Sequence, residues 1–317
     1  MIGTLTRLAV FFLAAMTLSF AACDERTKPR KVSLEKKDHL PSPNASIYSS
    51  EPVFRIAVGG MITPREGFAY YRKFLDYIGK RLGRRVEFVD RDNYAEINRL
   101  IRDQKVDAAF VCGGPYVDGH DEFGMELLAA PMAYGDMVYY SYIIVPKDSS
   151  ASSLRDLRNM TFAFTDPLSN TGKLVPTYLL AVMGENPERF FRKFVYMGTH
   201  DKSIEAVARK IVDGAAVDSL IWEYANRMNP EFTSRTKIIG KSKPFGIPPI
   251  VVRPGLDGKT KKKLRKIVLT AHADSEGRAI LAGMMIEKFV VVDDGAYDSI
   301  REMKRWLKNH SAARVTP

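Results

Sequence analysis

The sequence predicts an α/β protein of two lobes, each built on a mainly parallel sheet covered by helices. Its 317 residues exceed the length of one ordinary domain. From residue 53, strand-like and helix-like segments alternate, and the alternation restarts near residue 160. We therefore assign residues 53–145, completed by residues 250–317, to a first lobe and residues 146–249 to a second lobe.

The first lobe is expected to begin with the order strand, helix, strand, helix, strand. The expected segments are a strand over 54–59, a helix from Thr63-Pro64 to Leu82, a strand over 85–89, a helix over 94–104 and a strand over 107–111. Proline is favoured at the first helical position because its missing N–H has no partner there anyway. A further strand over 138–146 makes the first crossing between the lobes.

The second lobe repeats this order. We expect a strand over 160–164, a helix over 171–183, a strand over 191–197, a helix over 203–212 and a strand over 215–218. Val106-Asp107-Ala108-Ala109 is echoed by Val212-Asp213-Gly214-Ala215-Ala216, which fits either chance or an internal repeat. The tail from residue 254 is expected to be mostly helical and to pack back on the first lobe. Its basic segment 259–266, with an apolar face at Leu264, Ile267 and Val268, indicates a solvated amphipathic helix.

The N-terminus indicates export. Arg7 is the only charged residue among the first 23 and precedes the apolar run 8–18, which is too short to span a bilayer. The run leads to Phe20-Ala21-Ala22-Cys23, which resembles the lipobox of bacterial lipoproteins, although leucine is usual where Phe20 stands. We expect residues 1–23 to form a lipoprotein-type signal peptide with Cys23 lipidated; ordinary cleavage after Ser19-Phe20-Ala21 is the alternative. Residues 24–52 are polar and predict a flexible tether.

Export limits the possible functions. Lys and Arg outnumber Asp and Glu by 48 to 37, but an exported protein is not expected to bind nucleic acid. Once Cys23 is the anchor, Cys112 has no second cysteine to pair with. The five histidines lack HxxxH spacing, so we expect neither a metal nor another cofactor.

The most informative segment is Asp166-Pro167-Leu168-Ser169-Asn170-Thr171-Gly172, which follows a predicted strand and opens a helix. Such a position gathers unpaired N–H groups, the positive end of the helix dipole and hydroxyl donors, a combination that suits a tetrahedral oxyanion. Ser169 is placed either to cap the helix or to donate to a ligand, and Gly172 permits close approach to the backbone. Taken alone, the same letters also fit an ordinary helix start.

Residues 166–176 resemble the anion-binding segment of the phosphonate-binding periplasmic proteins, the substrate-binding subunits of phosphate, phosphite and phosphonate ABC importers. Further segments agree in order over residues 54–292, among them Asp92-Asn93-Tyr94-Ala95, Tyr139-Tyr140-Ser141 and Gly198-Thr199-His200. The resemblance implies a type II-like periplasmic-binding-protein fold and a monomer without enzymatic activity. It also implies that the protein closes over a small phosphorus oxyanion and then docks on a permease of the inner membrane.

The resemblance implies roles for individual residues. Ser169, Asn170, Thr171 and Gly172 would bind the phosphoryl oxygens, and His200 would donate to another oxygen. Tyr94 and Tyr139 would supply phenol donors from the opposite lobe or the hinge, with packing as the alternative.

Two departures from the family bear on the ligand. The carboxylates that hold the amine of an aminoalkyl phosphonate align with Leu220 and Pro248, which favours phosphite, phosphate or a small alkylphosphonate instead. Asp218 is suited to accept a hydrogen bond from P–OH and so to discriminate against sulfate, or else to bond to backbone at the hinge.

Two other functions remain open from the sequence. A binding protein of this kind can report to a membrane receptor instead of a permease. An enzyme on the same scaffold would use Cys112 as nucleophile, although no base is evident near it in the sequence.

Overall fold

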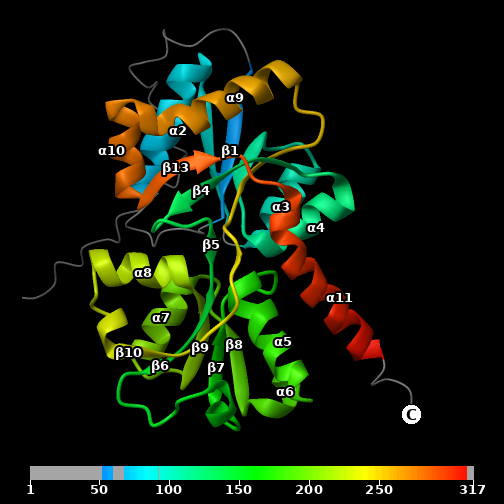
Figure 1. Ribbon diagram of the computed structural model, residues 1–317, viewed down its shortest axis with the longest axis vertical. Coiled ribbons are helices and arrows are strands. Elements are labelled where there is room, and N and C mark those ends of the chain that lie inside the picture. Colours follow the sequence, from blue (N-terminus) through cyan, green and yellow to red (C-terminus); the bar gives the residue numbers. More distant parts are fainter. Residues whose placement is uncertain (1–51, 60–67, 92, 313–317) are drawn as a thin grey trace, which may run out of the picture. The chain divides into compact units, whose positions relative to one another are not determined.

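The computed structural model describes residues 52–59, 68–91 and 93–312. The predicted signal peptide, Cys23, the tether and the cap at Thr63-Pro64 lie outside the described residues. The described chain contains two large sheets and one small two-stranded sheet (Figure 1). Within the described residues, no helix is both long enough and apolar enough to cross a membrane.

The first sheet has six strands, four of which run in one direction. In spatial order they are β13 (Ile286–Val290), β4 (Glu126–Ala133), β12 (Ile250–Val252), β3 (Ala108–Phe110), β1 (Phe54–Val58) and β2 (Val86–Asp90). Strands β1, β2 and β3 pair in parallel, whereas β12 and β13 run against their neighbours. The reversed β12 follows the second crossing, so the chain enters this sheet from its other end.

Five long helices pack on or beside the first sheet: α2 (Phe68–Leu82), α3 (Tyr94–Arg102), α4 (Gly113–Phe123), α9 (Gly258–Thr270) and α10 (Ser275–Gly283). As predicted, α9 buries Leu264, Ile267 and Val268 and leaves its lysines on the outer side. Helices α9 and α10 pack against α2, so the tail does return to the first sheet. Helix α4 begins directly after Cys112, which is in extended conformation and makes no side-chain capping bond.

The second sheet has five strands. In spatial order they are β10 (Thr236–Lys241), β6 (Ser141–Pro146), β9 (Gly214–Asp218), β7 (Thr161–Phe164) and β8 (Lys193–Tyr196). Only β6 runs against the other four. Its helical elements are η2 (Leu154–Leu157), η3 (Asn170–Leu174), α5 (Val175–Val182), α6 (Pro187–Phe190), α7 (His200–Ala208), α8 (Ser219–Met228) and η4 (Thr233–Arg235). Strand β6, which includes residues assigned to the first lobe from the sequence, pairs with β9 in this sheet.

The two segments that cross between the large sheets pair with each other. Strand β5 (Val138–Tyr139) and strand β11 (Phe245–Gly246) form an antiparallel ribbon in which Phe245 lies opposite Tyr139. The single strand predicted over 138–146 is therefore two strands, β5 and β6, that belong to different sheets. This division makes the ribbon the connection between the two lobes.

The predicted sequence echo has a structural counterpart. The carboxylate of Asp107 accepts a hydrogen bond from the N–H of Arg55 at 2.9 Å, and that of Asp213 accepts one from the N–H of Thr161 at 2.7 Å. Each aspartate thus precedes one strand (β3 or β9) and ties it to the parallel neighbour (β1 or β7). The same connection in both sheets favours an internal repeat over chance.

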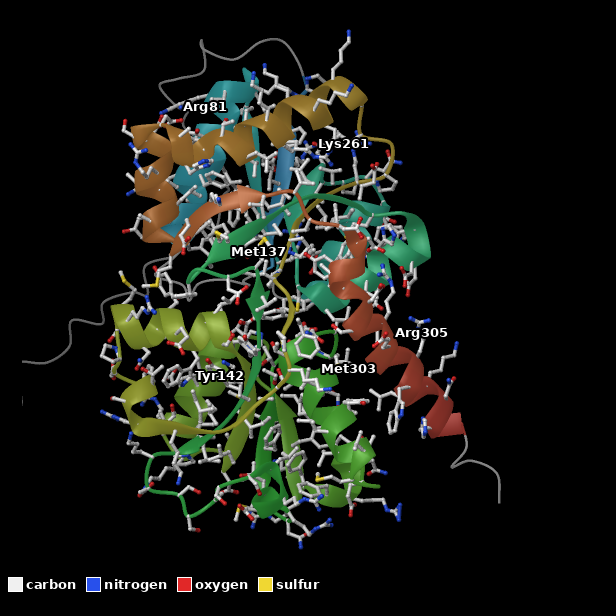
Figure 2. The ribbon with its side chains drawn as sticks, viewed as in Figure 1. Arg81, Met137, Tyr142, Lys261, Met303 and Arg305 are labelled. Carbon is white, nitrogen blue, oxygen red and sulfur yellow. The ribbon has the colours of Figure 1, made fainter. Side chains whose placement is uncertain are left out.

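The final helix, α11 (Asp298–Ala312), follows the short turns η5 (Ala271–Ala273) and η6 (Asp294–Tyr297) and contacts both lobes. Arg301 and Lys304 form ion pairs with Asp121 and Asp118 of α4. Farther along, the Trp306 ring packs edge-on against Tyr178 of α5, with ring centroids 5.1 Å apart. Figure 2 shows Arg305 directed away from the protein, while Met303 is buried.

Candidate functional site

The predicted anion-binding segment follows β7 directly. Ser169 is extended and caps the next helix, because its hydroxyl oxygen accepts the N–H of Gly172 at 2.9 Å. Ser169, Asn170 and Thr171 have no exposed surface. A side chain at Gly172 would collide with Thr165 and Ser169, so only glycine fits. These four residues therefore meet at one buried helix start.

The first turn of this helix is wider than an α-helical turn. Residues Asn170–Leu174 form a π-helix, which the sequence reading did not predict, before α5 begins at Val175. Pro176 has no N–H, so the carbonyl groups of Thr171 and Gly172 receive no bond from it. Thr171 O instead accepts the hydroxyl of Ser141 at 2.6 Å, and Gly172 O accepts the N–H of Thr165 at 3.3 Å. The proline thus releases carbonyls that fix the segment to β6 and β7.

His200 is a neutral donor in this site. Burial lowers the pKa of its imidazole to about 3, so the ring is uncharged near neutral pH. Its Nδ1 accepts the N–H of Asp218 at 3.0 Å and therefore carries no proton. The single proton of the neutral ring must then be on Nε2, which is buried and has no partner among the described residues.

Asp218 is completely buried at the end of β9, where it caps α8. Its Oδ1 accepts the N–H of Leu220 at 2.8 Å, whereas Oδ2 has no partner in the described chain. Burial raises the pKa of this carboxyl well above its usual value, against the N–H groups of Leu220 and Ile221, which lower it. A proton is therefore readily held on Asp218 or shared with an acidic ligand.

Four buried polar atoms without a partner belong to the residues of this site. They are Asn170 Oδ1, Thr171 Oγ1, His200 Nε2 and Asp218 Oδ2, out of eight such atoms in the described residues. Each buried polar atom that makes no hydrogen bond costs about 1–3 kcal/mol. Their concentration is the main evidence for a site that binds a polar ligand.

The predicted tyrosines lie beside this group. Tyr139 is fully buried, and its hydroxyl accepts the side-chain N–H of Asn170 at 3.0 Å, so its own proton can be donated to a ligand or to the thiol of Cys112. The side chain of Tyr94 is also buried. Burial raises the pKa of both phenols, and the charge of nearby Asp218 raises it further. Both hydroxyl groups consequently keep their protons as hydrogen-bond donors.

Cys112 is a buried packing residue. Its thiol lies 3.6 Å from the hydroxyl of Tyr139. Burial raises the pKa of this thiol to about 11, although N–H groups of Asn170 and Gly114 lower it. A thiol with this pKa is a poor nucleophile at neutral pH, which argues against the enzymatic alternative.

The two lobes meet closely around the site. The N–H of Tyr94 donates to Asp166 Oδ2 at 3.2 Å, and the Tyr224 hydroxyl donates to Gly283 O at 3.2 Å. Gly114, near the start of α4, lies against the backbone of Leu168 and Asn170, where any side chain would collide. The described structure is thus a closed form in which the site is sealed from solvent.

Several of these residues were not predicted. Asp166 was noted only as part of a motif, yet it bonds both Leu168 N and Tyr94 N. Thr165, whose hydroxyl lies 3.1 Å from His200 Nδ1, carries no distinctive signal because a threonine at a strand end is common. The only sequence feature that could have indicated the close approach of Gly114 to the backbone of Leu168 is the pair of glycines at the start of α4.

Leu220 and Pro248, the positions aligned with the amine-binding carboxylates, are buried. Leu220 belongs to the same apolar cluster as Tyr139 and Phe245. No charge is therefore supplied at these positions.

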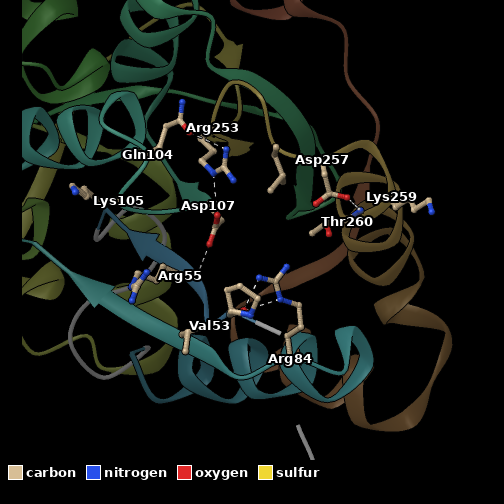
Figure 3. A pocket seen from close by; sticks show the side chains of 12 residues that line it. Val53, Arg55, Arg84, Gln104, Lys105, Asp107, Arg253, Asp257, Lys259 and Thr260 are labelled. Carbon is tan, nitrogen blue, oxygen red and sulfur yellow. Dashed lines mark hydrogen bonds and ion pairs between the residues drawn. The ribbon is translucent and has the colours of Figure 1, made fainter. Parts of the chain in front are cut away.

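The pocket in Figure 3 lies elsewhere. It is at the ends where β1 and β3 begin, whereas Tyr94 and Cys112 follow the ends where β2 and β3 finish. Basic side chains in it hold neighbouring segments together: Arg253 pairs with Asp107 at 3.0 Å, and Arg84 donates to Pro52 O. We regard it as structural.

The fold and the site define a two-lobe binding protein that encloses a small polar ligand. Residues 57–297 match the family described as ABC transporter, phosphonate, periplasmic substrate-binding protein. The chain belongs to this family and is a substrate-binding protein of an ABC importer, and membership implies a periplasmic location. It is 30% identical over 235 residues to the phosphonates-binding periplasmic protein of Escherichia coli strain K12, which covers 73% of this chain and 69% of the relative.

Solved structures confirm the two-lobe periplasmic-binding-protein fold. A binding protein component of an ABC phosphonate transporter from Pseudomonas aeruginosa matches with a TM-score of 0.77 and 28% identity, over 83% of this chain and 89% of that one. PhnD1 of Prochlorococcus marinus MIT 9301, solved in complex with methylphosphonate, matches with a TM-score of 0.73 and 20% identity, over 81% and 98% of the two chains. At this identity the second match concerns the fold alone.

Proposed function

We propose that the protein captures a small phosphorus oxyanion, namely phosphite, phosphate or a small alkylphosphonate, and delivers it to an ABC permease after hinge closure. The observation that carries the proposal is the group of unpaired buried polar atoms contributed by Asn170, Thr171, His200 and Asp218. They lie at the starts of three helical elements, η3, α7 and α8, where the dipoles and the free N–H groups favour an anion. The names of the relatives from Escherichia coli and Prochlorococcus marinus agree with this ligand class.

The choice among anions depends on protons and on the missing carboxylates. The raised pKa of Asp218 lets one proton be shared between Oδ2 and a phosphorus oxygen. Sulfate brings no proton at neutral pH, so its binding would require Asp218 to take one from solvent. An aminoalkyl ligand would place an ammonium group near buried Leu220, without a charge partner.

Calorimetric titration of the chain beginning at residue 24 tests the proposal. The protein is first unfolded and refolded to remove any ligand carried through purification. We expect tight binding of at least one among phosphite, phosphate and methylphosphonate. For 2-aminoethylphosphonate we expect binding at least tenfold weaker than for the best of these, and for sulfate no measurable binding.

Two results would contradict the proposal in different ways. Tightest binding of the aminophosphonate would show that the interpretation of Leu220 and Pro248 is wrong while the ligand class stands. If none of the five anions binds to correctly folded protein, the ligand class itself is wrong.

We also propose that Cys23 carries a lipid anchor, on the strength of Phe20-Ala21-Ala22-Cys23. In a bacterial host, Cys23→Ser is expected to move the protein from the membrane fraction to the soluble periplasmic fraction. Cys112→Ser, which changes a buried thiol far along the chain, serves as the control and should leave the fractionation unchanged. Wild-type protein found already in the soluble periplasmic fraction would support ordinary cleavage instead, and Cys23→Ser protein that stays in the membrane fraction would show that the anchor is not at Cys23.

A further inference from the structure

Tyr71 is a buried residue of α2 whose ring and hydroxyl have different surroundings. The ring belongs to the apolar core of the first lobe and packs edge-on against Phe110, with ring centroids 5.2 Å apart. The side chain is 1% exposed. The hydroxyl, in contrast, has no hydrogen-bond partner among the described residues.

This unpaired hydroxyl is an exception within the described chain. Six tyrosines are almost completely buried, and the hydroxyl groups of the other five make hydrogen bonds. Their partners are Asp274 for Tyr77, Asp294 for Tyr116, Asn170 for Tyr139, Gly283 O for Tyr224 and Ile247 O for Tyr297. Each of the other almost completely buried phenols thus has a hydrogen-bond partner within the described residues, and Tyr71 is the exception.

The position of Tyr71 places it beside the candidate site. Its ring contacts Phe110 at the end of β3, and Cys112, which follows closely in the chain, has its thiol 3.6 Å from the hydroxyl of Tyr139. The electrostatic contributions to its pKa agree with this position. Burial raises the pKa of Tyr71, and the charges of Tyr224 and Asp218 raise it further. Both of these residues come from the second lobe, and Asp218 has the same effect on Tyr94 and Tyr139, the two tyrosines expected to bind the ligand. Asp218 also raises the pKa of Tyr134 and Tyr142, but the hydroxyl groups of these two tyrosines donate hydrogen bonds to Met285 and Glu223.

We propose that Tyr71 is a further ligand-binding residue, whose hydroxyl donates to an oxygen of the enclosed oxyanion from the first lobe. The inference rests on the proposed function and extends it. Since Asn170, Thr171, His200 and Asp218 all belong to the second lobe, the bond from Tyr71 forms only when the first lobe closes over the bound anion. Tyr71 thus makes closure depend on the presence of ligand.

The test compares Tyr71→Phe with Tyr77→Phe, two changes that each remove one buried hydroxyl from α2. The hydroxyl of Tyr77 donates to Asp274 at 2.6 Å, on the side of α2 that packs against α10. Affinity for the tightest-binding anion of the panel is measured by calorimetry, and stability without ligand by urea unfolding. We expect Tyr71→Phe to weaken binding by about tenfold to a hundredfold, the usual effect of losing a hydrogen bond to a charged group, without lowering stability.

Tyr77→Phe is expected to show the opposite pattern, with lower stability and unchanged affinity. Wild-type affinity in Tyr71→Phe would overturn the inference while leaving the proposed function intact. A loss of affinity accompanied by an equal loss of stability would also overturn it, because the hydroxyl would then be structural. Failure of the wild-type protein to bind any of the anions would instead count against the proposed function.

Discussion

His200→Ala is expected to weaken binding of the preferred anion by about a hundredfold. The change removes the Nε2–H donor and also the Nδ1 acceptor that holds the N–H of Asp218 at 3.0 Å. Two elements of the site are therefore lost together. Calorimetry at pH 7.5 measures the effect, and His120→Ala is the matched control because His120 is partly exposed and bonds Met125 O within the first lobe.

His200→Ala is also expected to change how the stability of the protein depends on pH. Because the folded pKa of His200 is about 3 and the unfolded value is near 6.5, the unfolded chain takes up a proton first as the pH falls. The contribution of His200 to the free energy of unfolding is therefore fully present above its unfolded pKa and is lost progressively as the pH falls toward 3. Between pH 7.5 and pH 5 this amounts to about 2 kcal/mol, which His200→Ala should abolish in urea unfolding. Equal pH dependence in both proteins would show that His200 is not buried as described.

Gly114→Ala is expected to weaken ligand binding by between about tenfold and a hundredfold without touching the ligand. A methyl group at this position would collide with the backbone oxygen of Leu168 and lie 3.3 Å from Asn170 N, across the boundary between the lobes. Backbone cannot move aside as a flexible side chain can, so the methyl group opposes closure. In the open form the collision is absent, and alanine is a better helix former than glycine.

The expected result is therefore lost affinity with unchanged or higher thermal stability of the ligand-free protein. Gly258→Ala makes the same change in the first turn of α9, where nothing lies within 4 Å of the added methyl group, so it should share any gain in stability but leave the affinity unchanged. Solution scattering with and without ligand shows whether closure is affected. A closed, tightly binding Gly114→Ala protein would refute the role of this contact.

Much of the fold was predictable because its signals are local. Strands β1, β2, β3, β7, β8 and β9 were found from apolar runs between turn residues, with ends within about two residues of those observed. The division of 138–146 into β5 and β6 was not predicted, since a continuous apolar run does not reveal that Tyr139 pairs with one crossing and Ser141 with the second sheet. Pairing of distant strands is a tertiary property.

The site was predictable only in part for a similar reason. The resemblance pointed to the segment around Thr171 and to His200, and the structure places both among the unpaired buried atoms. Tyr71 and Thr165 were missed because neither residue type nor spacing separates them from core residues. The π-helical turn was missed as well, although Pro176 lies at the end of the segment that the resemblance singled out.

Helix α11 contributes to closure in a way that the ligand does not. Its first half is held to α4 by the ion pairs of Arg301 and Lys304. In its second half, the ring of Trp306 packs against Tyr178 of α5. Opening the lobes must separate the two rings or pull the helix from α4. The apparent affinity of a protein that must close is its intrinsic affinity multiplied by the fraction already closed. An aromatic pair remote from the anion thus helps to set the lowest concentration of nutrient that the cell can still collect.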